Sequence, residues 1–462
     1  MPISLSILWS GFEKQYSNFL WGFTFILISH YWLLHLHPLT WLGFSWVSSI
    51  LISNIIWLFC SLLGGLLVVL WGLIGSSVVF KQNIFSLTEK QIYTRVVLMS
   101  LIWGFGEQFL SQTSFLWIGV GESLIPGDIY FAGLAKIIGV TGVCSLELLI
   151  GFWIFYIFMK CKSKLKFHKV LFLGLLCILF LHIIGSFLIL PTVRNDVYPI
   201  AIWQTNIPTR EKLFLSNKQI TNQILIAQER ALSQNARLLV APEGTLKRNF
   251  TFQEQSKINT LIGGFRVEKN NIRNSLLAFK KGDKSYSKYI DKYRLVPLGE
   301  WIPNIFNKIP LDLSSMGELE AGNHQRYFDL ENIPPFAASI CYEITDGLGI
   351  RAAINDGAKF ILGIANLDPY PSKIFDQYLS LARMRSIENN IDTVIASNTG
   401  PSGLIRNDGR IEKIFDLNLE KNEVVHVNLL NQKSLYCSYG LVPLILVFII
   451  IIIYINFIEE IN

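Results

Sequence analysis

Residues 335–343, PFAASICYE, place a cysteine at the end of an apolar run, with a glutamate two positions later. A short run of small and apolar residues is typical of a buried strand, so Cys341 is expected where that strand ends. A lone cysteine in such a run usually packs as a small hydrophobic residue. A cysteine at a strand end can also be a nucleophile, so both interpretations of Cys341 have to be weighed.

The sequence on both sides of this strand alternates between strand and helix patterns. Strands are predicted at 198–204, 236–243, 260–267, 274–279, 360–367 and 392–398, and helices at 211–234, 349–358 and 372–390. This alternation predicts a layered α/β domain, which we place at 192–434. A segment of this length can bury one substantial core.

The chain as a whole is too apolar for a water-soluble protein of this size. Of its 462 residues 51% are hydrophobic and only 16% are charged, and the mean hydropathy is +0.40. No Asp, Glu, Lys or Arg occurs in the 66 residues from Gln15 to Phe80. A membrane crossing needs about 20 apolar residues, so the sequence predicts a polytopic membrane protein. No cleavable signal peptide is evident, and no basic cluster interleaved with aromatic residues suggests nucleic-acid binding.

The hydrophobic segments predict about five spans in an N-terminal transmembrane domain, 1–191, and one C-terminal helix within 435–462. The spans are expected at 19–36, 44–80, 92–110, 137–159, 170–190 and 437–458. Segment 44–80 is long for one helix and short for two, and its composition leaves both possibilities open. The basic loops are 81–95 and 160–169, and the second carries five lysines in ten residues. The positive-inside rule assigns both loops to the cytoplasm, which favours one helix at 44–80 and puts the α/β domain in the periplasm.

Two further stretches place reactive side chains where predicted strands end. Glu243 lies in APEGT, and Lys292 opens KYRLVPLGEWIP, residues 292–303. Each residue alone would usually be a solvated strand end. Together with Cys341 they could serve acyl transfer, because a carboxylate can take the proton of the thiol and an ammonium can stabilise the thiolate and an oxyanion. The six cysteines show no metal-binding spacing, and acyl transfer through a thiol needs no metal or organic cofactor, so none is expected.

These motifs resemble the nitrilase, or carbon–nitrogen hydrolase, superfamily, whose catalytic set is Glu–Lys–Cys. KYRLVPLGEWIP, followed by ICYEI (340–344) and LARMRSIE (381–388) and flanked by hydrophobic spans, resembles its membrane-bound branch, the apolipoprotein N-acyltransferase family. The resemblance implies an α-β-β-α sandwich. It also implies that Glu243 is the general base, Lys292 the catalytic lysine and Cys341 the nucleophile. The supporting residues that it implies are Glu300, Tyr342, Glu343 and Asn274. Arg383 and Arg385 are expected to hold their helix against neighbouring carboxylates.

The same resemblance implies the reaction and its partners. The acyl chain would pass from a membrane phospholipid, such as phosphatidylethanolamine, through a thioester on Cys341 to the N-terminal amine of a diacylglyceryl-modified apolipoprotein. The protein would be a multi-pass protein of the bacterial inner membrane with its catalytic domain on the periplasmic face. The main alternative is a membrane-anchored amidase or nitrilase-type hydrolase. A transporter or scaffold with a degenerate external domain, and an enzyme that acylates another amine, also remain open.

The chain departs from the family pattern in loops that would guard the site. ANLDPYP stands at 365–371, and Leu213 lies where a tryptophan is common. Two further N-terminal spans of the family are expected to be missing or reduced to residues 1–18. Residues 304–326 are expected to form an apolar lid that excludes water. These differences bear on substrate handling and leave the three candidate catalytic residues in place.

Overall fold

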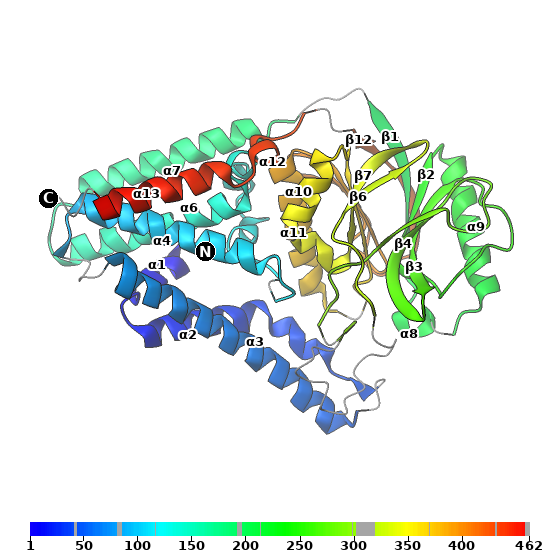
Figure 1. Cartoon of the computed structure of the whole chain (residues 1–462), viewed down its shortest axis with the longest axis horizontal. Helices are drawn as coiled ribbons and strands as arrows, with labels where there is room; N and C mark the ends of the chain where they lie inside the picture. Colours follow the sequence, from blue (N-terminus) through cyan, green and yellow to red (C-terminus); the bar gives the residue numbers. More distant parts are fainter. Residues whose placement is uncertain are drawn as a thin grey trace. The chain divides into compact units, whose positions relative to one another are not determined.

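In the computed structural model the chain folds into two compact units (Figure 1). One unit comprises Met1–Ile189 and Ser438–Asn462, and the other comprises Leu190–Cys437. The structure describes residues 1–40, 44–80, 86–115, 117–191, 196–212, 214–297, 299–301, 319–368, 370–429 and 432–457.

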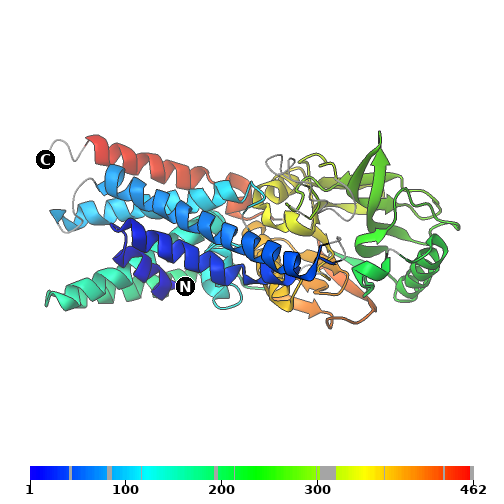
Figure 2. The same cartoon turned by 90° about the horizontal axis from the view of Figure 1, so that it is seen from below.

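The first unit is helical. Its longer helices are α1 (Pro2–Ser10), α2 (Gln15–Ser29), α3 (Trp46–Ile74), α4 (Glu89–Leu110), α6 (Ala135–Lys162), α7 (His168–Leu188) and α13 (Val442–Phe457). Both views show α4, α6, α7 and α13 as a bundle of long helices (Figures 1 and 2). The core between the helices is rich in aromatic side chains, among which Trp9, Trp71 and Phe152 are buried and in ring contact.

Three of the described helices are long and apolar enough to cross a membrane. They cover Trp46–Phe80, Ala135–Lys162 and His168–Leu188. Segment 44–80, which the sequence left open, is therefore one continuous helix whose last turns, Gly75–Phe80, are π-helical. The first predicted span differs: α2 has only 15 residues, and the chain continues as a 3₁₀-helix over Tyr31–Leu36. At 1.5 Å per residue α2 is about 22 Å long, less than the bilayer core.

The basic segments lie at one end of the helical unit. Lys160, at the end of α6, forms an ion pair with Glu89, at the start of α4. Lys90 lies over the ring of Tyr454, near the end of α13. From this end α7 runs back, and His182 contacts Asp128, which precedes α6, at 2.8 Å. The chain therefore leaves α7 at the end opposite to the basic segments.

The second unit is built from two six-stranded sheets. One sheet has the order β12-β1-β2-β3-β4-β5 and the other β11-β10-β9-β8-β7-β6. The strands of the first are β1 (Val197–Gln204), β2 (Leu238–Leu246), β3 (Asn259–Glu268), β4 (Asn271–Phe279), β5 (Lys288–Asp291) and β12 (Lys421–Asn428). Those of the second are β6 (Tyr327–Leu330), β7 (Ile333–Ile340), β8 (Ile361–Ala365), β9 (Thr393–Ser397), β10 (Gly403–Ile405) and β11 (Ile411–Ile414).

Alternating side chains make both faces of the first sheet apolar. Leu238 and Val240 belong to a core shared with Ile340 and Ile364 of the second sheet, so the two sheets pack face to face. The intervening Leu239 faces the other way and packs with α9 (Asn217–Ser233). A period of two with both faces buried is the pattern of a central strand.

Helices α10 (Gly347–Asn355) and α11 (Ser372–Asn389) lie on the second sheet, so the order of layers is α-β-β-α (Figure 1). The predicted combination of a helical membrane domain and an α-β-β-α sandwich is confirmed. Strands β1, β2 and β3 are mutually parallel, as are β7, β8 and β9. Clefts beyond the carboxyl ends of parallel strands are where α/β sheets usually hold their ligands, so a site is expected at those ends.

Candidate active site

The candidate nucleophile sits on a sharp turn. Strand β7 ends at Ile340, and Cys341 begins a 3₁₀-helix, Cys341–Thr345, instead of extending the strand to residue 343 as predicted. Its φ is +54°, a left-handed conformation that a residue with a side chain rarely adopts. Strained backbone of this kind is concentrated at functional sites. The cysteine is buried, and its thiol is a hydrogen-bond partner of the Glu243 carboxylate.

The Glu243 carboxylate is held by three hydrogen-bond donors in addition to the thiol. Its Oε1 accepts from Lys292 Nζ at 2.9 Å and from Asn274 Nδ2 at 2.7 Å. Its Oε2 accepts from the backbone N–H of Asn366, directly after β8, at 2.9 Å. These bonds fix both oxygens, so the carboxylate is oriented before any substrate arrives.

Lys292 lies between two carboxylates. It follows β5, and its Nζ contacts Glu243 Oε1 at 2.9 Å and Glu300 Oε1 at 2.8 Å. Asn274 Nδ2 also donates to Glu300, at 3.1 Å, and so links the two acids. Glu300 is fixed in turn by the Val296 N–H, which donates to its Oε2 at 2.9 Å.

The charges of the cluster set the resting protonation states. Burial alone would lower the pKa of Lys292, but the adjacent carboxylates of Glu243 and Glu300 outweigh burial and hold that pKa well above its usual value. Burial, followed by the negative charge of Glu243, raises the pKa of the Cys341 thiol well above its usual value, and Lys292 opposes this only in part. The resting cysteine is therefore a neutral thiol beside a carboxylate, and it needs that base to become nucleophilic.

Glu343 fixes the turn that carries the nucleophile. Its Oε2 accepts from the Ile340 N–H at 2.9 Å and from Arg326 Nη1 at 2.8 Å. Its Oε1 accepts from the Tyr293 N–H at 2.7 Å. One carboxylate thus ties the end of β7 to the residue after Lys292. Tyr342 is buried in the same turn, and its carbonyl oxygen accepts from Thr345 Oγ1 at 2.8 Å.

The structure thus brings together Glu243, Lys292, Cys341, Glu300 and Asn274, whereas Glu343 braces the site without touching the thiol. Of the two arginines in LARMRSIE, Arg385 pairs with Glu388 of its own helix. Arg383 donates instead to the carbonyl oxygen of Gly409, which is a backbone atom and not a carboxylate as expected.

Three residues beside this cluster were not singled out from the sequence. Arg326 pairs with Glu343, and Asn398 donates to Asn366 Oδ1 at 3.0 Å. Lys212, at the end of the short helix α8 (Thr209–Lys212), lies close enough for the Glu243 charge to act on it. No pattern in the sequence distinguished Lys212 from the other lysines of the α/β domain. Leu213 and Pro369, and residues 304–318 of the expected lid, lie outside the described residues.

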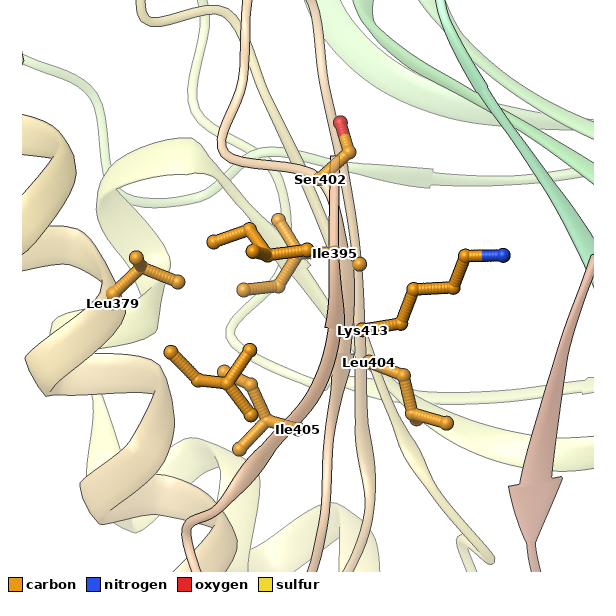
Figure 3. Close-up of a pocket in the computed structure, with 9 residues that line it drawn as sticks. Leu379, Ile395, Ser402, Leu404, Ile405 and Lys413 are labelled. Atoms are coloured by element: carbon orange, nitrogen blue, oxygen red, sulfur yellow. The ribbon is translucent and has the colours of Figure 1, made fainter. Parts of the chain in front are cut away.

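The described residues contain no group of three or more His, Cys, Asp or Glu side chains that could hold a metal ion. A small apolar depression elsewhere, lined by Leu379, Ile395 and Leu404 among others, lies between α11 and strands β9–β11 (Figure 3). It leaves no room for a water molecule, so it is not a second ligand site. The chemistry available to the cluster is that of a base, a cation and a thiol, as acyl transfer requires.

Comparison with known proteins gives relatives over nearly the whole chain. Residues 245–428 match the family model described as carbon-nitrogen hydrolase. An apolipoprotein N-acyltransferase of Prochlorococcus marinus subsp. pastoris is 51% identical over 98% of this chain and 91% of its own length. An enzyme of the same name from Parasynechococcus marenigrum is 34% identical over 89% of this chain and 86% of its own length. Among solved structures, a nitrilase-superfamily member from Saccharomyces cerevisiae is 15% identical, with a TM-score of 0.37 over 55% of this chain and 97% of its own.

Proposed function

The chain belongs to the apolipoprotein N-acyltransferase family of carbon–nitrogen hydrolases, and from this premise we propose that it moves a fatty acyl chain from a membrane phospholipid, through a thioester on Cys341, to the N-terminal amine of a lipoprotein. The protein is a membrane-bound acyltransferase of lipoprotein maturation. The thioester, the phospholipid donor and the residue roles are the parts that we propose. The observation that supports them most is that the buried Glu243 carboxylate contacts both the Cys341 thiol and the Lys292 ammonium.

In the first half-reaction Glu243 takes the proton of the Cys341 thiol, and the sulfur attacks the carbonyl carbon of a donor ester. Negative charge develops on the carbonyl oxygen, where the Lys292 ammonium and backbone N–H groups near Tyr342 stabilise it. The ester C–O bond breaks, and Glu243 returns its proton to the departing oxygen of the lyso-phospholipid. The acyl chain remains on sulfur as a thioester.

In the second half-reaction the amine of the diacylglyceryl-modified N-terminal cysteine of the acceptor attacks the thioester carbon. Its proton passes to Glu243, the C–S bond breaks, and the proton returns to the thiolate. The product is an amide, and the enzyme regains its neutral thiol and ionised carboxylate. Two substrates that react in turn through one covalent intermediate give ping-pong kinetics.

Membrane attachment follows from the substrates. Their acyl chains cost about 0.8 kcal/mol per CH₂ to transfer into water, so a site at the lipid surface avoids most of that cost. The chain enters the catalytic unit from the end of α7 that lies opposite to the basic segments around Lys160. Together with the positive-inside rule, this arrangement supports a catalytic unit on the periplasmic face of the inner membrane.

The test is intact mass spectrometry of the purified protein after exposure to phosphatidylethanolamine alone. We expect the mass to increase by one acyl chain on Cys341. When a diacylated lipopeptide is added, this increase should disappear and the lipopeptide should become N-acylated. Cys341→Ala should show no gain, whereas Cys161→Ala, which removes an exposed cysteine, should behave as the unmodified protein. No adduct in lipid-binding protein would contradict the proposal. Free fatty acid without acylated peptide would favour the hydrolase alternative.

A further inference from the structure

The Lys212 ammonium is buried and, in the part of the chain that the structure describes, lacks a hydrogen-bond partner. Its Nζ is inaccessible to solvent, and no acceptor lies within hydrogen-bonding distance of it among the described residues. The other lysine of the site, Lys292, contacts two carboxylates instead. Burying an ammonium away from water without a hydrogen-bond acceptor costs free energy. The unpaired ammonium of the resting site is therefore available to a substrate group that can accept its hydrogen bonds.

The helix that carries Lys212 is braced against the catalytic cluster. Thr209 N–H donates to Asp368 Oδ2 at 2.8 Å, and Asn366 Nδ2 donates to Thr209 Oγ1 at 3.0 Å. Asn366 in turn donates its backbone N–H to Glu243 Oε2. Two consecutive hydrogen bonds therefore connect α8 with the candidate base. The position of Lys212 is fixed relative to the thiol, because the same carboxylate is the partner of Cys341.

Resting on the function proposed above, we infer that Lys212 binds the phosphodiester group of the phospholipid donor and so positions the ester of that donor at Cys341. Of the two substrates, the donor brings a permanent anion, which lies a few bonds from the ester to be cleaved. The reacting group of the acceptor is an amine, which offers no anion for an ammonium to bind. A compact ammonium with three donors suits phosphate oxygens as a point charge.

The charges that act on Lys212 come from other elements. Burial lowers the pKa of Lys212 to about 8, and the carboxylates of Glu243 in β2 and Asp368 after β8 oppose this decrease. The proton is therefore held below about pH 8 and lost above it, well before an exposed lysine would lose it. The affinity for the phospholipid, which depends on the charged ammonium, should be constant below this pH and should fall above it.

The experiment measures acylation of Cys341 by two donors with identical acyl chains in mixed micelles: phosphatidylethanolamine, and the diacylglycerol that lacks the phosphate headgroup. Lys212→Met removes the charge, and Lys212→Arg retains it. Lys218→Met is the matched control, because Lys218 is exposed in α9. We expect Lys212→Met to reduce acylation by the phospholipid roughly 10- to 150-fold relative to acylation by diacylglycerol, the loss expected for a hydrogen bond to a charged group. Lys212→Arg should retain most of the preference, and Lys218→Met all of it.

If Lys212→Met reduces acylation equally with both donors, the inference is overturned, since Lys212 would then act on chemistry common to both esters or on folding. No loss with either donor would overturn it as well. A protein that forms no Cys341 adduct with either donor would instead contradict the proposed function itself, so the two failures are distinguishable.

A second measurement uses pH. In a Cys341→Ala background, which cannot be acylated, the dissociation constant for the phospholipid should be constant up to about pH 8 and then rise, approaching tenfold per pH unit. Adding Lys212→Arg should abolish this rise, because the guanidinium stays charged. A rise that persists with arginine would assign the titration to another group and count against the inference.

Discussion

At the scale of single residues, the site depends on buried charges that are compensated by neighbouring groups, as Glu343 shows. Glu343 is 1% exposed and accepts hydrogen bonds from the Ile340 and Tyr293 N–H groups and from Arg326. Removing one partner of a buried ion pair leaves the other charge uncompensated in a medium of low dielectric constant. The same pair on the surface would be worth little, because water and salt screen it.

We therefore predict that Glu343→Gln lowers the free energy of unfolding by about 3–5 kcal/mol, the usual loss when a buried pair is broken. The glutamine NH₂ would face donors, and the guanidinium of Arg326 would lose its counter-charge. Thermal unfolding followed by tryptophan fluorescence measures the effect, and acylation of Cys341 should slow in parallel. The comparison variant is Glu420→Gln, whose exposed pair with Arg230 should contribute less than about 1 kcal/mol. Similar losses in both variants would contradict the role assigned to Glu343.

At the scale of elements, the position of the carboxylate depends on how closely two strands approach. Strand β3 passes beside the end of β2, and Gly263 lies against the residue that carries the candidate base. A Cβ on Gly263 would lie 2.4 Å from Glu243 Cα and 2.5 Å from the carbonyl oxygen of Pro242. Both are backbone atoms, so relief requires the strands themselves to move.

Gly263→Ala should therefore destabilise the catalytic unit by about 1–3 kcal/mol, as overpacking usually does. It should also slow acylation of Cys341, because the shift displaces Glu243 from Lys292 and the thiol. Melting temperature and the acylation rate are the two measurements. The same substitution at Gly106, where a new methyl group would meet nothing within 4 Å, is the control and should lower neither quantity. An alanine at 263 that lowers neither quantity would show that the strands can separate freely.

At the scale of the whole molecule, the α/β unit is an insertion between membrane-type helices, with α7 before it and α13 after it. The ion pair of Glu89 with Lys160 and the contact of Lys90 with Tyr454 bring basic segments together at one end of the helical unit. The positive-inside rule therefore predicts that this end of the helical unit faces the cytoplasm.

We predict that a membrane-impermeant thiol reagent modifies Cys161, an exposed cysteine in the basic segment, only after spheroplasts are permeabilised. A cysteine introduced by Ser233→Cys, at the exposed end of α9, should be modified in intact spheroplasts. In the Cys161→Ser control the modification that requires permeabilisation should disappear, which assigns it to Cys161. The reverse pattern would place the catalytic unit in the cytoplasm and contradict the proposed location.

The sequence by itself determined the layers and the chemical groups of this protein. Strand periodicity at 236–243 and 360–367 is a local property, and both faces of these strands are buried as the apolar runs indicated. The sequence motifs singled out Glu243, Lys292 and Cys341, because the residue type itself defines the chemical group of the side chain. The length and uniform apolarity of 44–80 were compatible with one helix or two, and only the folded helix Trp46–Phe80 decided between them.

The tertiary structure alone decided which distant groups meet. Glu243 contacts Asn274 and Lys292 across 31 and 49 residues of sequence, and Asn366 across 123. No local pattern encodes such contacts, because they depend on the order of strands in two sheets. The turn at Cys341 has the same origin: an apolar run favours a longer strand, but the hydrogen bonds that Glu343 accepts from Ile340 and Tyr293 end the strand at Ile340. Only the folded structure identifies the unpaired ammonium of Lys212 among the described residues. Whether a side chain has a hydrogen-bond partner depends on three-dimensional packing, and no local sequence pattern encodes it.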